Sequence, residues 1–151
     1  MTIRDGIDVD LEERVRKDLR FLFSDYAATI SSNSLEAFGN STVTVSVGNL
    51  EFQFLKNNRD GEFRVSIAPR NGHGVWELIH VALAASTGED AATLKVPISY
   101  QDNPTDPTYI GLTKLALVLQ SRFENLNYAF APENYPSTHS RMVQIERRVH
   151  P

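Results

Sequence analysis

The stretch TVTVSVGNLEFQFLKNNRDGEFRVSI, residues 42–67, decides the fold class. Apolar and polar residues alternate in three runs, which are separated by Gly48-Asn49 and by the polar segment 56–61. A period of two residues is the pattern of a strand with one buried face and one solvated face. Glycine at the first position of a two-residue loop supplies the positive φ that a type II′ hairpin requires. We therefore predict a three-stranded antiparallel meander over residues 42–68.

The two loops also predict a strand register. A two-residue loop at 48–49 places Val45 opposite Phe52, and a second loop with Leu55 facing Glu62 places Phe52 opposite Val65. In this register the apolar side chains of the three layers lie on one face, and a slip of one residue would destroy the arrangement. The predicted layers across the three strands are 43/54/63, 45/52/65 and 47/50/67.

Two helices flank the predicted sheet. From Asp10 the apolar residues follow a helical spacing as far as Ile30, with Asp10 as the expected N-cap and the polar run 31–34 as the expected end. Over 109–130 apolar residues recur at alternating spacings of three and four, which predicts a long helix from about 108 to 131. That stripe fits a helix lying on the apolar face of the sheet, and it would also fit a coiled-coil seam.

The remaining segments are shorter. Residues 75–86 are apolar on nearly all sides, which predicts a short buried helix ended by Gly88. Residues 94–100 alternate again, but Pro97 lacks a donor for a ladder, so we expect an edge strand or an extended segment. We expect a further short strand over 142–146.

These patterns together predict one α+β domain spanning residues 1–151. Its core is an antiparallel sheet of three to four strands, with the N-terminal and the long C-terminal helices on one face and the short buried helix between them. A chain of 151 residues, 41% of them hydrophobic, can bury such a core without disulfides or a structural metal.

Composition excludes several functional classes. The chain has no cysteine, which removes disulfides and thiolate chemistry, and no apolar run approaches the roughly 20 residues of a membrane span. Its first residues do not form a signal peptide, so we expect a cytoplasmic protein of bacterial type. The net charge is −4 and no block is strongly basic, which argues against nucleic-acid binding.

One group of residues could support metal or anion chemistry. His73, Glu77 and His80 would share one side of the short helix if that helix reached back to His73, and two imidazoles with a carboxylate suit zinc or iron. Arg70 and the glycines beside His73 could bind an anion at the helix N-terminus. A glycine-rich loop followed by a solvated helix edge explains the same residues, and we expect no bound metal or cofactor. A metal- or anion-dependent enzyme centred on Arg70, His73, Glu77 and His80 is the alternative.

The main functional hypothesis rests on a second loop. Residues 86–107 carry one basic and four acidic side chains, a net charge of −3, and two prolines restrict the backbone of 101–107. A stiff acidic loop suits recognition of a basic protein surface, with Tyr100, Asp102, Asp106 and Tyr109 as the predicted contacts. We therefore expect a non-enzymatic protein-binding module, such as an immunity or accessory protein. A solvated connector and a homodimer through the 109–130 helix are the alternatives.

Overall fold

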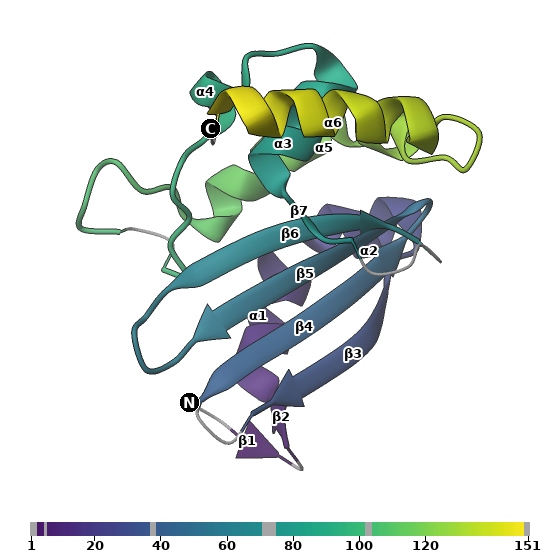
Figure 1. Ribbon diagram of the computed structural model, residues 1–151. Coiled ribbons are helices and arrows are strands. Elements are labelled where there is room, and N and C mark those ends of the chain that lie inside the picture. The colour runs from purple at the N-terminus through teal and green to yellow at the C-terminus, as the bar shows by residue number, and fades with distance from the viewer. Residues whose placement is uncertain (1–2, 5, 37–38, 71–74, 102–103, 150–151) are drawn as a thin grey trace.

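The computed structural model describes residues 3–4, 6–36, 39–70, 75–101 and 104–149. Their fold is α+β, with a five-stranded antiparallel meander in the order β3-β4-β5-β6-β7 (Figure 1). The strands are β1 (Ile3–Arg4), β2 (Ile7–Asp8), β3 (Thr29–Leu35), β4 (Asn40–Val47), β5 (Leu50–Asn57), β6 (Phe63–Pro69) and β7 (Glu77–Leu78). The helices are α1 (Val9–Asp18), α2 (Arg20–Tyr26), α3 (Ile79–Thr87), α4 (Ala91–Leu94), α5 (Leu112–Ala129) and α6 (Tyr135–Val149).

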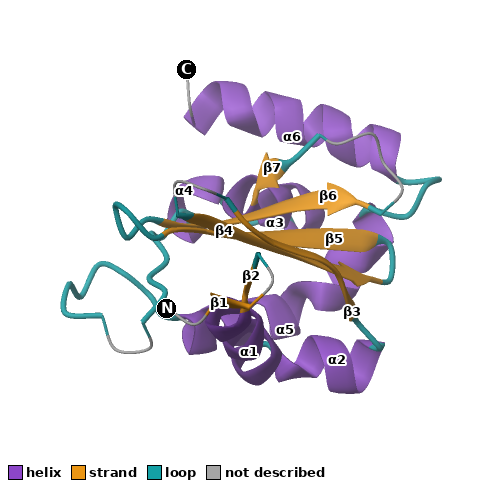
Figure 2. Ribbon diagram, turned by 90° about the horizontal axis from the view of Figure 1, so that it is seen from below, coloured by secondary structure: helices purple, strands orange, loops and turns teal. Residues whose placement is uncertain are grey.

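Helices cover one face of this sheet, as the sequence predicted. Figure 2 shows α1, α2 and α5 together on one side of the strands, while α6 lies on the other side, near β6 and β7. The apolar stripe of α5 is buried, including Leu119, Phe123 and Leu126. Asn127 of α5 also holds the tip of the first hairpin, since its Oδ1 accepts a hydrogen bond from the Asn49 backbone N–H at 2.8 Å.

The first hairpin has the predicted register. Val45 is paired with Phe52 and Val47 with Leu50 across the two-residue loop. Gly48 has a φ of +56°. Among the described residues Ala27 is the only non-glycine residue with a positive φ, so the φ of Asn49 is negative, as a type II′ turn requires.

The predicted register of the second hairpin is wrong by two residues. Phe52 is opposite Ile67 and Phe54 is opposite Val65, because pairing continues to Lys56 and Phe63. The Asn57 side chain closes the tighter turn by accepting hydrogen bonds from the backbone N–H groups of residues 59 and 60. A shift of two residues leaves every side chain on the same face, and the alternation could not detect it.

The N-terminal prediction needs correction at both ends. The N-cap is Asp8 and not Asp10, because the Asp8 side chain accepts a hydrogen bond from the Leu11 backbone N–H. The helical segment breaks at Leu19 and ends at Tyr26, where Ala27 adopts a left-handed conformation with φ +57°. Residues 29–35, whose polar run was expected to end the helix, form edge strand β3.

Two further segments differ from the sequence prediction. The short helix begins at Ile79 and not near 75, because residues 77–78 pair with β6 as strand β7, while its end at Gly88 is confirmed. Residues 91–94 form α4, and Ile98 makes only an isolated bridge with Ile110 in place of an edge strand.

The C-terminal segment is a helix and not a strand. The predicted strand 142–146 lies inside α6, where Met142 is buried against the rest of the core. Arg141 ties this helix to α3 by donating from Nε to the backbone oxygen of Ala85 at 3.0 Å. Residues 138, 142, 145 and 149 are more buried than most of their neighbours, and their spacing of three and four residues is that of a helix. The short alternation of apolar and polar residues over 142–146 had indicated a strand instead.

Candidate partner-binding surface

The connector between α4 and α5 is closed at its base by a short parallel pairing. The Ser99 backbone N–H donates to the Ile110 oxygen at 2.8 Å, and the Ile110 N–H donates to the Pro97 oxygen at 3.0 Å. The described residues between them, 100–101 and 104–109, lie in a loop that projects away from the helices and strands (Figures 1 and 2). The sequence placed the predicted contacts in a loop, and the structure shows that this loop protrudes.

Asp106 organises the far part of this loop. Its Oδ1 accepts hydrogen bonds from the Thr108 backbone N–H at 2.9 Å and from the Thr108 hydroxyl at 2.8 Å. These two donors lower the pKa of Asp106, so the exposed carboxylate stays ionised. Tyr109 follows with 42% of its surface exposed. Asp102 lies outside the described residues.

Tyr100 has a different environment from Tyr109. Its ring lies 5.7 Å from the ring of Phe63, while Lys56 Nζ is 4.0 Å and the Arg14 guanidinium 5.1 Å from the ring centroid. Burial is the main cause of the raised pKa of the Tyr100 hydroxyl. The half-buried ring with two cations beside it fastens one end of the loop to the body of the protein.

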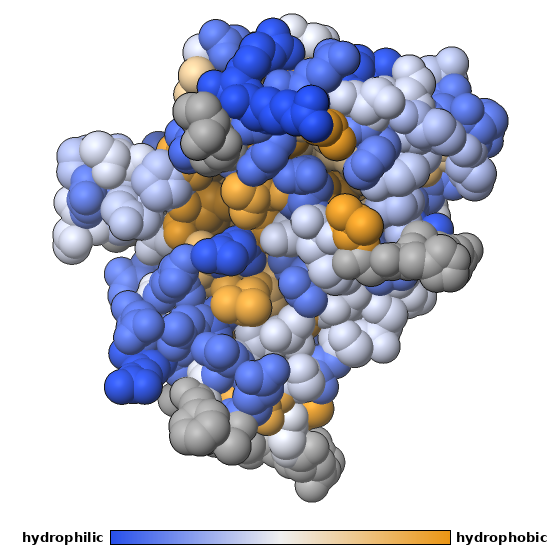
Figure 3. All heavy atoms as spheres, in the orientation of Figure 1, coloured by the Kyte–Doolittle hydropathy of each residue, from blue (hydrophilic) through white to orange (hydrophobic). Residues whose placement is uncertain are grey.

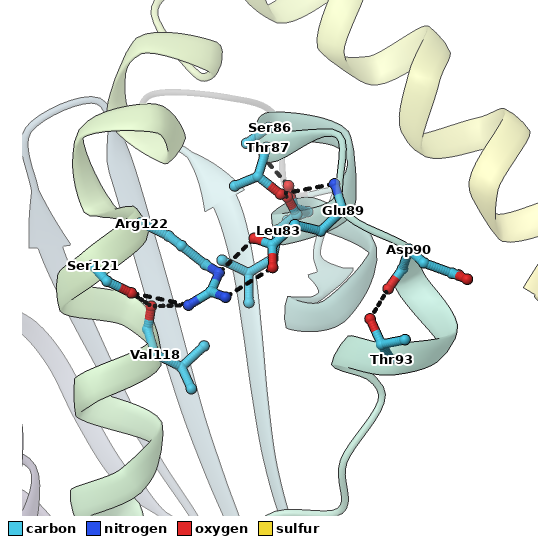
Figure 4. Close-up of polar contacts among 10 residues, drawn as sticks. Leu83, Ser86, Thr87, Glu89, Asp90, Thr93, Val118, Ser121 and Arg122 are labelled. Atoms are coloured by element: carbon cyan, nitrogen blue, oxygen red, sulfur yellow. Dashed lines mark hydrogen bonds and ion pairs between the residues drawn. The ribbon is translucent and has the colours of Figure 1, made fainter.

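The other two acidic residues of the block are engaged within the chain (Figure 4). Arg122 of α5 donates from Nε and Nη2 to the two carboxylate oxygens of Glu89, at 2.6 and 2.8 Å. This pairing lowers the pKa of Glu89 and ties the end of α3 to α5. Asp90 caps α4 by accepting from the Ala92 backbone N–H. Glu89 and Asp90 therefore fix the base from which the connector leaves.

The structure changes the geometry expected for the alternative metal or anion site. Glu77 lies in a strand and His80 is buried in α3, so Glu77 and His80 do not share one helix; His73 lies outside the described residues. Arg70 is exposed and donates from Nη1 to the Gly48 backbone oxygen. Within the described ranges, no three His, Asp or Glu side chains are arranged to hold a metal ion.

Glu77 faces Glu146 of α6 and forms a carboxyl pair with it. Desolvation and the hydrogen bond and negative charge of Glu146 raise the pKa of Glu77 to about 7. Tyr135, also on α6, has its own pKa raised by burial and by the charge of Glu77. Glu77 and Glu146 therefore meet between the edge of the sheet and the C-terminal helix.

Sequence reasoning missed a groove next to the connector. The groove has a volume of about 480 Å³ and lies between the start of β6, the start of α3 and residues 95–98. Apolar side chains gather on this face beside β6 (Figure 3). The groove forms where β7 stops, and the sequence pattern did not show that residues 77–78 form a strand.

The comparisons with known proteins found no counterpart: no protein-family model, no curated protein and no solved structure matches this chain. In the part of the chain that the structure describes, no helix is long and apolar enough to cross a membrane.

Proposed function

We propose that this chain is a non-enzymatic protein-binding module, of the immunity or accessory type, that recognises a basic surface on its partner through the connector 99–109. The observation that carries the proposal is the form of this connector, which projects from the body and is fixed at both ends. Its base is closed by the pairing of Ile98 with Ile110, and Tyr100 packs against Phe63. A loop fixed in this way loses less conformational entropy on binding than a free one.

Charge and exposure support the same surface. The Asp106 carboxylate is exposed and ionised, and Tyr109 supplies an exposed aromatic ring three residues later. An acidic loop with an aromatic residue suits a basic partner, because charge accelerates encounter and an aromatic ring supplies contact area. In this proposal Tyr109 contacts the partner, Tyr100 holds the loop in place, and Asp102 adds a second negative charge.

The test measures how fast this chain associates with a candidate partner protein that has a basic surface. Asp102→Lys combined with Asp106→Lys should lower the association rate about tenfold at low salt and flatten its salt dependence. The matched control compares Asp106→Lys with Glu133→Lys, which makes the same change of charge at an exposed site in the turn between α5 and α6. Equal rates for these two single variants would show that net charge, and not the connector, governs the encounter.

The homodimer hypothesis needs a different surface from the predicted stripe. The stripe residues of α5 are buried within the chain, whereas Leu117 and Tyr128 of the same helix are 64% and 73% exposed. Sedimentation equilibrium of the wild type and of Leu117→Glu tests this face. A dimer that this substitution dissociates would replace the connector as the proposed interface.

A further inference from the structure

Helix α6 is fastened to the rest of the protein mainly through its N-terminal half. The hydroxyl of the buried Thr138 donates to the backbone oxygen of Ala129 at 2.7 Å, and Arg141 donates from Nε to the Ala85 oxygen. Beyond these anchors Met142 is the last buried residue of the helix. The C-terminal half of α6, residues 142–149, therefore has fewer attachments than the half before it.

The C-terminal half of α6 packs incompletely on the elements beneath it. A cavity of about 460 Å³ separates them, with Ala85 and Ala91 of α3 and α4 on one side and Ile145 and Arg148 of α6 on the other. Under this cover α3 carries seven consecutive buried residues, Ile79–Ala85. Release of residues 142–149 would thus break few contacts and would uncover an apolar helix.

Two polar atoms of α6 are buried without a partner. Among the described residues, His139 Nδ1 and Glu146 Oε2 are the only buried side-chain nitrogen or oxygen atoms that lack a hydrogen-bond partner. Burial of such a group is destabilising, because it gives up its hydrogen bond to water and receives none in return. The side of α6 that carries these two residues is therefore the least well satisfied contact of the described chain.

The Glu146 carboxyl group meets that of Glu77 at this contact. Burial, and then the hydrogen bond and negative charge of Glu146, raise the pKa of Glu77 from 4.5 to about 7. β6 places the apolar Ile67 opposite Glu77. The other titratable side chains on the elements packed here are Tyr135 and His139 of α6 and His80 of α3. Above pH 7 two negative charges face each other at the place where α6 is held least well.

We propose that residues 142–149 of α6 form a pH-sensitive latch, which is closed over α3 while the Glu77–Glu146 pair carries a proton and opens when both carboxyl groups are ionised. The anchors at Thr138 and Arg141 keep the N-terminal half of the helix in place. The released segment is too short to remain helical alone, so it unfolds and exposes α3. The latch is independent of the proposed function, since the connector 99–109 takes no part in it.

Amide hydrogen exchange of the full chain at pH 6 and pH 8, corrected for the intrinsic pH dependence of exchange, tests the latch. Exchange of residues 142–149 should rise about fivefold at pH 8, and it should be faster than in the central strand β5, which reports unfolding of the whole chain. Glu77→Gln should abolish the rise, because a neutral amide carries no charge at either pH. Glu133→Gln is the matched control at an exposed site between α5 and α6, and it should keep the rise.

Glu146→Gln is the second variant. It should reduce the rise without abolishing it, since it removes the like charge but leaves Glu77 buried. Equal exchange of residues 142–149 at the two pH values, or exchange as slow as that of β5, would overturn the latch. A rise that persists in Glu77→Gln would overturn it as well, because another group would then control the helix.

Discussion

The two edges of the sheet are built in opposite ways. At the β3 edge a bulge between Ile30 and Ser32 interrupts the ladder, and the strand sequence TISSNSL is mostly polar. The β1–β2 hairpin also covers its end, since the Leu35 backbone N–H donates to the Gly6 oxygen at 2.8 Å. Bulges, polar side chains and covering segments are the devices by which proteins prevent unwanted strand pairing.

The β6 edge has a cover on only half of its length. β7 pairs with Ser66 and Ile67, whereas beside Phe63 and Val65 the neighbour of β6 is the groove and not a strand. The two edges thus differ in how they end: a bulge and polar side chains limit pairing along β3, whereas β6 has a strand neighbour along only part of its length.

The centre of the sheet is the reference for both edges, and we expect the largest loss of stability there. Phe52→Ala should cost about 3–5 kcal/mol in unfolding free energy, because Phe52 is fully buried between Val45 and Ile67. Gln53→Ala, on the outer face, should stay within about 0.5 kcal/mol. Urea denaturation measures both. Equal costs would show that the outer face is as closely packed as the inner one.

Two proline variants test the direction of the backbone groups along β6. Because the Asn57 N–H donates to the Glu62 oxygen and the Arg70 N–H to the Asn49 oxygen, the even-numbered residues of β6 bond to β5. Ser66→Pro removes an N–H of this kind, whereas Val65→Pro removes one that faces away from β5. We expect Ser66→Pro to lose about 2 kcal/mol more unfolding free energy than Val65→Pro, because the former leaves a buried ladder acceptor unpaired. Chemical denaturation of the two proteins gives the difference. A larger loss for Val65→Pro would reverse the assigned direction of the backbone groups.

The protected edge depends on Asp8. Its fully buried carboxylate caps α1 and accepts from the Ser41 hydroxyl at 2.6 Å, and its backbone N–H donates to Asn33 of β3. Asp8→Ala should cost about 2 kcal/mol through loss of the cap and of this buried bond, and it should speed amide exchange in β3. Asp10→Ala is the control, with about 0.5 kcal/mol expected for a first-turn carboxylate. The opposite order would restore Asp10 as the cap.

The smallest expected effect concerns the cover of the β6 edge and depends on pH. The pKa of Glu77 is raised from 4.5 to about 7 in the fold, so the folded state binds a proton more tightly than the unfolded state. The stabilisation is complete below pH 4.5 and is lost as pH rises through 7, by about 1 kcal/mol after solvent screening. Glu77→Gln should flatten this part of the stability curve measured by thermal unfolding at several pH values. An unchanged slope in the variant would assign the proton to another group.

The α+β class, the first hairpin and the buried stripe of α5 can all be predicted from the amino-acid sequence. These features depend on local chemistry: alternation of period two, the glycine at position 48, and apolar spacings of three and four are each visible within a few residues. The protruding loop was also predictable, because prolines and acidic residues without periodicity indicate a surface connector.

The register of the second hairpin, strands β3 and β7 and the groove depend on contacts between segments that are distant in the sequence. The register of the second hairpin could shift by two residues without moving any side chain to the other face, so the turn formed by Asn57 had to select it. Strand β3 is mostly polar and strand β7 has only two residues, and each exists because a neighbouring strand pairs with it. The groove at Phe63–Val65 follows from β7 stopping at Leu78, which is a relation between distant segments that no local pattern encodes.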